Sequence, residues 1–239
     1  GPDAWELGVN ISVDEMTIGF QGRHVDKLRI SYKKEGDGFQ CDALCDDGYC
    51  FSIYFRNEPP PRRYTSQGLS PLHARCMWLF DQVKEEGHRC RVDNLYMSAK
   101  FAKACYNHKK QVLIEGVGRK SGRGVPLHVI QEEVKRQHEG TTRGTVKAAV
   151  LKGDPDCPDF VSVSVYDTKP VHFISMVTDC IKWVTKSRKV WNKALGIMEA
   201  IEFLRPNVND KCNGEMNGVD ISDHLRTIYR IDHWPRQKK

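Results

Sequence analysis

The strongest constraint on the fold is a change of hydrophobic period along the first half of the chain. Apolar residues alternate with polar ones over residues 9–18, and shorter runs of the same kind occupy 28–32, 39–43 and 51–55. A period of two is typical of strands with one buried face, so this part predicts an antiparallel meander. From residue 70 the order becomes helix, strand, helix, strand, which favours a mixed sheet covered by helices.

The two helices of this alternating part have recognisable start signals. Ser70 and Pro71 supply an N-cap and a first-turn proline, and apolar residues then recur at helical spacing until Gly87 closes the helix. Ser98 begins the second helix, between a short strand at 90–93 and strand-like residues 111–117. We therefore predict an α/β fold.

Composition indicates a soluble globular protein. Apolar residues make up 39% of the 239 residues and charged residues 28%, and the chain has neither a run of 18 apolar residues nor a signal-peptide pattern. This length suits one large domain or a domain with an inserted subdomain, with no membrane partner. Gly1 and Pro2 are interpreted as a protease-cleavage scar, so the chain is expected to be an excised domain.

The composition of the sequence changes after Gly118, where a segment rich in Gly and Arg begins. We predict an insertion over residues 119–209, between a first part at 1–118 and a closing helical segment within 210–239. Within the insertion the patterns indicate a helix at 126–137 and strands at 145–151, 160–166 and 171–177. An amphipathic segment with candidate core residues follows at 191–204.

Basic residues are concentrated in two stretches, although the net charge of +6 is moderate. Ten Lys/Arg lie between Lys109 and Lys152 against four Glu, and residues 181–198 hold five basic residues and no acid. Either stretch is a surface for a polyanion or an ordinary solvated face. The candidates for DNA binding are Arg119, Lys120, Arg123, Lys182, Lys186, Arg188, Lys189 and Lys193.

The nine cysteines contain no C-x-x-C pair, and reduced thiols in a cytosolic or nuclear protein are expected. Cys41, Cys45 and Cys50 are close in sequence but flank a turn signal and lack a fourth ligand nearby. We interpret them as buried hairpin thiols and not as a zinc site.

Four carboxylates could carry chemistry. Asp14 lies within an apolar strand pattern, where alternation places its side chain opposite that of Val13. Asp93 ends a short strand, and Asp220 and Asp223 share one face of a late helix. Taken singly, each suits an ordinary role: a surface strand residue, a turn acid, or a first-turn helix acid. Together they could hold Mg²⁺ or Mn²⁺, because paired divalent ions bound by carboxylates serve phosphoryl transfer.

Three sequence blocks resemble the piggyBac family of DDE/D transposases. Residues 12–23, SVDEMTIGFQGR, are similar to that family's Asp-Glu-x-x-x-x-Phe-x-Gly-Arg block, residues 92–98, VDNLYMS, to its second block, and 216–223, MNGVDISD, to its third. Leu95, Met97 and Asn217 depart from the usual residues, whereas all four acids are present.

The resemblance implies an RNase H-like mixed sheet flanked by helices, interrupted by an insertion domain, in a nuclear enzyme. It implies cut-and-paste DNA transposition, with Asp14, Asp93, Asp220 and Asp223 as catalytic metal ligands for Mg²⁺ or Mn²⁺. The implied partners are double-stranded transposon ends and a TTAA target. The family's cysteine-rich zinc-binding tail is not found in these residues, and the oligomeric state, monomer or homodimer, stays open.

Two rival functions remain at this point. A domesticated, transposase-derived protein would bind DNA or a partner without transposing, which the departures at Leu95, Met97 and Asn217 allow. An unrelated Mg²⁺ nuclease of the same fold is disfavoured by the match at residues 20–23. The retained acids favour the transposase.

Overall fold

The computed structural model describes residues 5–20, 22–29, 37–119, 145–151, 155, 160–166, 170–177 and 179–229. The chain divides into two compact units. Unit 1 comprises Gly1–Val92, His108–Val112 and Glu215–Lys239, and unit 2 comprises Asp93–Asn107 and Leu113–Gly214. Among the described residues, no helix is both long enough and apolar enough to cross a membrane.

Unit 1 contains a mixed sheet with the strand order β2-β3-β1-β5, and β4 pairs with β3. Strand β1 runs antiparallel to β3, with Val13 opposite Leu44, and parallel to β5, with Val13 opposite Val92. The expected antiparallel pairing is confirmed for β3 with β4, but β1 pairs with β3 and not with the short β2, so the strands do not follow a simple meander. Residues 30–36 lie outside the described residues. The strands are β1 (Asn10–Gly19), β2 (Leu28–Arg29), β3 (Asp37–Asp46), β4 (Tyr49–Phe55) and β5 (Arg89–Val92).

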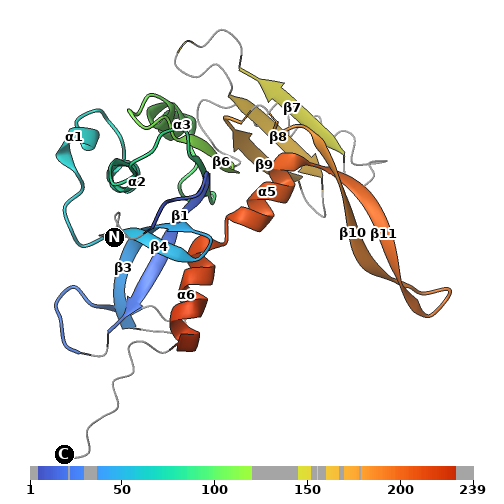
Figure 1. Cartoon of the computed structure of the whole chain (residues 1–239), viewed down its shortest axis with the longest axis horizontal. Helices are drawn as coiled ribbons and strands as arrows, with labels where there is room; N and C mark the ends of the chain where they lie inside the picture. The colour runs from blue at the N-terminus through green and yellow to red at the C-terminus, as the bar shows by residue number, and fades with distance from the viewer. Residues whose placement is uncertain are drawn as a thin grey trace, which may run out of the picture. The chain divides into compact units, whose positions relative to one another are not determined.

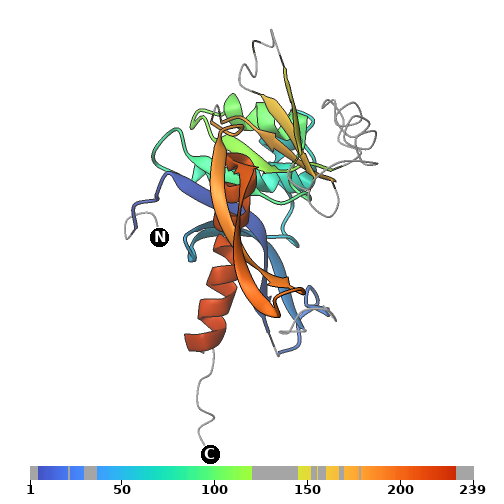
Figure 2. The same cartoon turned by 90° about the vertical axis from the view of Figure 1, so that its right-hand side faces the viewer.

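Helices cover both faces of this sheet (Figures 1 and 2). Helix α6 (Gly218–Tyr229) packs on β1, β3 and β4, and buried Val219 contacts the core residues Met16, Cys41 and Cys45. On β3, Asp42 alternates with Cys41, so its side chain is on the other face, where Arg75 of α2 (Pro71–Asp81) binds it. The two helices therefore lie on opposite faces of β3. A single helical turn, α1 (Arg62–Thr65), precedes α2.

A buried carboxylate joins α2 to the sheet. Asp42 is fully buried and accepts from Arg75 Nε at 2.6 Å and from Arg56 Nη2 at 2.7 Å. Arg56 also reaches Glu15 at 3.3 Å. A buried charge is tolerated only when it is paired and hydrogen-bonded, and Asp42 meets that condition twice.

Unit 2 contains an antiparallel sheet in the order β6-β9-β8-β7, with α3 packed on β6. The N-cap expected at Ser98 is confirmed, because its hydroxyl accepts from Phe101 N at 3.2 Å. The expected strands of this region are confirmed as well. The elements are α3 (Ala99–Tyr106), β6 (Leu113–Val117), β7 (Val146–Val150), β8 (Val161–Tyr166), β9 (Pro170–Ser175) and α5 (Asn207–Glu215).

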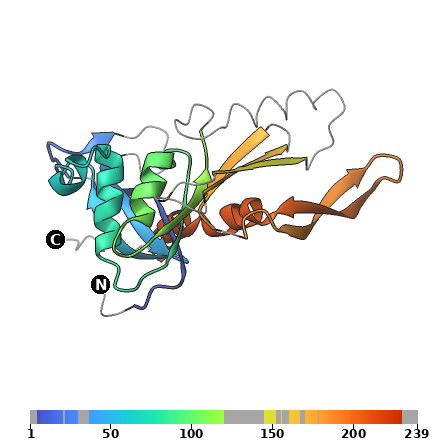
Figure 3. The ribbon, with the colours of Figure 1, turned by 90° about the horizontal axis from the view of Figure 1, so that it is seen from above.

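A two-stranded ribbon, β10 (Trp183–Asn192) and β11 (Ile197–Pro206), extends from the rest of unit 2 (Figures 1 and 3). The expectation of core residues at 191–204 is wrong. Trp191 is 55% exposed, Leu195 61% and Met198 55%, because the segment forms a hairpin whose two faces are not covered by other described elements. An amphipathic pattern shows that a segment has an apolar face but not what covers that face.

Several boundaries differ from the expected ones. Helix α2 ends at Asp81, and Gly87 lies beyond it at φ +78°, in the loop before β5. Helix α5 was not predicted, and the helix expected at 126–137 lies outside the described residues. The contact-based units also cut the chain at residues 93, 108, 113 and 215, whereas residues 119 and 210 were the expected borders of the insertion, and those borders remain a prediction.

Candidate active site

Asp14 is presented on the α6 face of β1. Val13, on the other face, is only 1% exposed, and Asp14 pairs with Ala43, which belongs to the core cluster under α6. The expectation that Asp14 points away from Val13 is therefore confirmed. Its Oδ1 accepts a hydrogen bond from Glu15 N at 2.7 Å, which fixes one carboxylate oxygen against the backbone.

The first turn of α6 lies close to β1. A Cβ on Gly218 would fall 2.3 Å from Ser12 Oγ, so a larger residue here would require Ser12 or the helix to shift. Asp220 follows two residues later and is exposed, as expected for the flank of a helix next to its buried stripe. On the opposite flank, Ile221 and Leu225 lie over Gly48 in the β3–β4 turn. Asp220 is consequently on the flank that faces away from β3 and β4.

Asp223 is held on the sheet side of α6 by Arg226. The guanidinium Nη2 donates to Asp223 Oδ1 at 3.2 Å and to the carbonyl oxygen of Thr17 on β1 at 2.6 Å. Val219, Asp223 and Arg226 recur at helical spacing along the buried stripe. Thus Asp14 and Asp223 project from β1 and α6 into the same layer of unit 1, whereas Asp220 is on the rim of that layer.

Asp93 is the residue that follows β5, at the carboxyl end of the strand as expected. Its Oδ1 accepts from Leu95 N at 2.6 Å, and its carbonyl oxygen accepts from Met97 N at 3.2 Å. These bonds form a compact turn that leads to the Ser98 cap of α3. Asp93 belongs to unit 2, whereas the other three acids belong to unit 1.

Carboxylate donors suit Mg²⁺ and Mn²⁺ in type, because these hard cations prefer oxygen ligands. In the described part of the chain, however, no three His, Cys, Asp or Glu side chains are grouped closely enough to hold a metal ion. The expected cluster of Asp14, Asp93 and Asp220 therefore stays a prediction. Each unit supplies part of the donor set that the resemblance implies.

Sequence reasoning missed a buried cation on the α6 face. Arg91 pairs with Ser12 in the parallel register and is fully buried, and its Nη2 lies 2.9 Å from Glu215 Oε2, just before α6. Alternation with Cys90 and Val92 suggests a solvated strand face at Arg91. The strand pattern places Arg91 on the face opposite Cys90 and Val92, but it could not reveal that Arg91 is buried beside Glu215.

Most of the cysteines behave as expected. All eight cysteines in the described part of the chain are free thiols, and Cys157 lies outside it. Burial, with smaller contributions from Cys50 and Asp42, raises the pKa of Cys41 to about 12. Cys41 and Cys45 are buried as expected, whereas Cys50 is half-buried and a hydrogen bond with Cys45 lowers the pKa of its thiol.

Some of the candidate DNA-binding residues make contacts within the chain, whereas others are exposed. Lys186 pairs with Asp210 at 2.8 Å, Arg188 lies over the Phe203 ring at 5.4 Å, and Arg119 Nε donates to Asn94 O at 2.6 Å. Lys182, Lys189 and Lys193 are exposed on or beside the ribbon, whereas Lys120 and Arg123 lie outside the described residues. The exposed lysines are the better candidates for contact with a polyanion.

The chain matches the model of the family described as Transposase IS4 over residues 3–239. It belongs to this family. Among solved structures it is similar to piggyBac transposase in a cryo-EM synaptic complex with hairpin DNA, with a TM-score of 0.67 and 20% identity. That likeness covers 93% of this chain and 41% of the other, so the chain spans less than half of the length of the transposase that it matches.

The family match and the structural likeness together confirm the resemblance to a piggyBac-type DDE transposase domain and the RNase H-like α/β fold. None of the curated proteins matches the chain.

Proposed function

We propose that this chain is the catalytic part of a DNA transposase that cleaves and joins DNA strands in cut-and-paste transposition. The observation that carries the proposal is the family match over nearly the whole chain, from residue 3 to residue 239. The likeness to piggyBac transposase in a complex with hairpin DNA supports it. The domesticated, non-transposing alternative is less favoured, because all four acids are retained.

In this proposal Asp14, Asp93, Asp220 and Asp223 hold divalent cations, Mg²⁺ or Mn²⁺. When bound, such ions supply Lewis-acid activation of the attacking and leaving oxygens in phosphoryl transfer. The chain's own part is to hold the carboxylates in a fixed geometry. The Glu15 amide orients Asp14, Arg226 orients Asp223, and the Leu95 amide orients Asp93.

Asp220 differs from the other three acids because it lies in the first turn of α6, where the helix dipole favours an anion. Its position depends on the close approach of Gly218 to Ser12. The proposed partner is double-stranded DNA, with transposon ends and TTAA as the target implied by the resemblance. Lys182, Lys189 and Lys193 would contact its phosphates, which supply affinity without reading sequence. A nuclear location and a homodimer remain predictions of the resemblance.

The first experiment measures metal binding by the 239-residue chain. Mn²⁺ titration by calorimetry, together with the melting temperature in Mg²⁺ or Mn²⁺, should show binding that stabilises the fold. Asp14→Asn should remove both signals, whereas Asp47→Asn, in the exposed β3–β4 turn, is a matched control that should retain them. Equal binding by both variants would place the metal elsewhere and would refute the proposed role of Asp14.

The second experiment measures strand cleavage. Supercoiled plasmid with Mn²⁺ should be nicked by the parent chain. Asp93→Asn and Asp223→Asn should each lower the rate by about 10–100-fold or more, because loss of a residue that only supports a metal ligand already costs that much. DNA binding without metal binding or nicking would support the domesticated alternative. Retention of nicking in both variants would contradict the assigned acids.

A further inference from the structure

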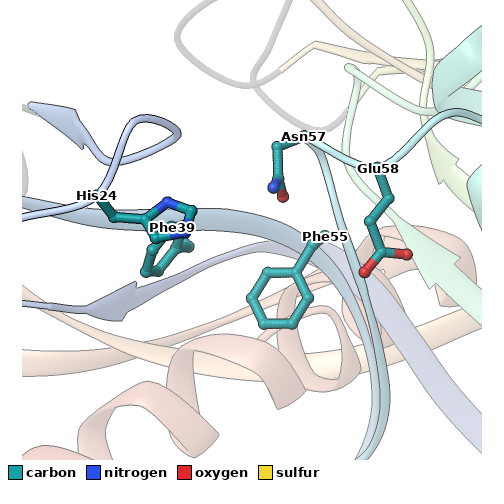
Figure 4. Close-up of a pocket in the computed structure, with 5 residues that line it drawn as sticks. All are labelled: His24, Phe39, Phe55, Asn57 and Glu58. Carbon is teal, nitrogen blue, oxygen red and sulfur yellow. The ribbon is translucent and has the colours of Figure 1, made fainter.

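A small pocket lies in unit 1 beside the ends of β3 and β4, away from the acids discussed above. It has a volume of about 180 Å³ and is lined by His24, Phe39, Phe55, Asn57 and Glu58. Figure 4 shows the ring of His24 over Phe39 on one side and Phe55 on the other, with Asn57 and Glu58 at the rim. We call these five residues the aromatic pocket.

The walls of the aromatic pocket are rings that hold one another in place. The Phe39 ring centroid lies 5.2 Å from that of His24 in an edge-on arrangement and 6.3 Å from that of Phe55, also edge-on. Phe20 packs behind Phe39 at 5.3 Å. Three rings therefore line this space, and a positive charge that lies over the face of such a ring is attracted to it.

The rim of the aromatic pocket is acidic. Glu58 is exposed, and it lines the pocket together with Phe55 (Figure 4). Asp26 is joined to the rim, because Asn57 Nδ2 donates to its Oδ2 at 3.2 Å. The neighbouring cation in sequence, Arg56, is directed to the buried Asp42 at 2.7 Å on the other face of the sheet. An anion such as a phosphate is therefore a poor ligand for this pocket, and a cation is a suitable one.

We propose that the aromatic pocket binds the methylated ammonium group of a lysine side chain in a peptide. The volume suits the end of one long side chain, and the rim is open to solvent, so the rest of the peptide can remain outside. A plain ammonium is strongly hydrated, and this mostly aromatic lining offers it few acceptors. Methyl groups reduce that hydration and add apolar surface, while the positive charge still interacts with the ring faces and with Glu58.

This ligand class does not depend on the proposed transposase function, since the pocket contains none of the four acids. A lysine-bearing peptide is also a better match than a small free cation. The pocket encloses only the tip of a ligand, so a free cation such as choline would lose its translational freedom for little contact area.

The test is a binding titration of the 239-residue chain with short peptides that differ at one residue. The probes contain trimethyllysine, unmodified lysine, or the neutral tert-butyl isostere of trimethyllysine, and free choline is the fourth ligand. We expect trimethyllysine to bind about twofold to fivefold more tightly than the isostere, because an exposed cation–π contact contributes about 0.5–1 kcal/mol. Amide chemical shifts should change at Phe55 and Glu58.

Three variants locate the site. Glu58→Gln should lower the affinity for the trimethyllysine peptide by about threefold to tenfold, as expected for loss of one rim charge near a partly desolvated cation. Glu86→Gln, which removes an equally exposed acid elsewhere in unit 1, should have no effect. Phe55→Leu keeps the site apolar and should abolish the preference for trimethyllysine over the isostere while the melting temperature confirms folding.

Each of the remaining outcomes would overturn the proposal. Equal affinity for the isostere would make the pocket a simple apolar slot. Choline binding as tightly as the peptide would assign it to a small cation. An equal effect of Glu58→Gln and Glu86→Gln would indicate nonspecific attraction to an acidic surface, and absence of binding by every probe would leave the aromatic pocket without this function.

Discussion

Gly218→Ala tests whether the approach of α6 to β1 is as close as the active-site geometry requires. Glycine is unfavourable in a helix, so alanine would ordinarily stabilise α6 by about 0.5–1 kcal/mol. Here the new Cβ would meet Ser12 Oγ at 2.3 Å and Cys45 Cβ at 3.6 Å. The first distance is roughly 1 Å shorter than an ordinary non-bonded contact. Ser12 is only 1% exposed, so its hydroxyl has little room to rotate away.

The expected change in stability follows from two opposing effects, the gain in helix propensity and the clash with Ser12. Forcing extra atoms into a packed layer costs typically about 1–3 kcal/mol, which exceeds the gain in helix propensity. We therefore expect Gly218→Ala to lower the free energy of unfolding by about 0.5–2 kcal/mol, measured by urea denaturation with hydrogen exchange at α6 amides. Gly214→Ala is the matched control, because that glycine is also helical and its Cβ would have no heavy atom within 4 Å. It should stabilise the protein by about 0.4–1 kcal/mol.

A double-mutant cycle identifies the atom responsible. Ser12→Ala removes a hydroxyl that donates a long hydrogen bond of 3.5 Å to Cys45 O, and should itself cost little. In that background Gly218→Ala should be neutral or stabilising, which corresponds to a coupling energy of about 1–2 kcal/mol. The reasoning is refuted if Gly218→Ala stabilises the parent chain, or if Ser12→Ala leaves its cost unchanged. Because Asp220 is two residues away, the single variant should also weaken Mn²⁺ binding.

Two further predictions concern charges on the two units. Replacing the buried Asp42 with Asn should destabilise unit 1 by about 3 kcal/mol in urea denaturation, because two arginines lose a carboxylate that water cannot replace. The control Asp37→Asn, at a solvent-accessible pair with Lys27, should cost less than about 1 kcal/mol. Similar losses in the two variants would show that Asp42 is hydrated. Charge reversal on the ribbon should weaken duplex DNA binding and make the affinity fall less steeply with salt concentration. An equal reversal at exposed arginines of unit 1 should leave binding unchanged. Equal losses of affinity in both variants would indicate a response to net charge alone. The paired double variants are Lys189→Glu with Lys193→Glu, and Arg29→Glu with Arg62→Glu.

The choice of ribbon residues illustrates how the structure changes an experiment designed from sequence. By sequence alone, Lys186, Arg188 and Lys189 are equivalent members of a basic stretch. In the structure, hydrogen bonds from Lys186 and Arg205 lower the pKa of Asp210 although its partial burial acts in the opposite direction. Reversing Lys186 would therefore place two acids together and perturb the base of the ribbon. Lys189 and Lys193 can be reversed without that cost, because both are exposed.

Local patterns in the sequence determined the parts of the fold that depend on neighbours along the chain. Strand alternation predicted β1, β3 and β4, and it placed the side chains of Asp14 and Val13 on opposite faces of β1. The Ser70 and Ser98 caps predicted the starts of α2 and α3. These predictions succeeded because strand faces and helix caps are decided within a few residues. The motif wording also identified the family, since blocks around Asp14, Asp93 and Asp220 occur in a fixed order.

Tertiary structure decided whatever depends on what covers a face. Arg91 has the pattern of a solvated strand residue, but it is buried and pairs with Glu215. Trp191 and Met198 have the pattern of core residues, although the ribbon leaves them exposed. The pairing of Asp42 with two arginines joins residues up to 33 positions apart. Periodicity reports the chemistry of each face, but burial is a property of the partner that packs on it, and that partner comes from distant sequence.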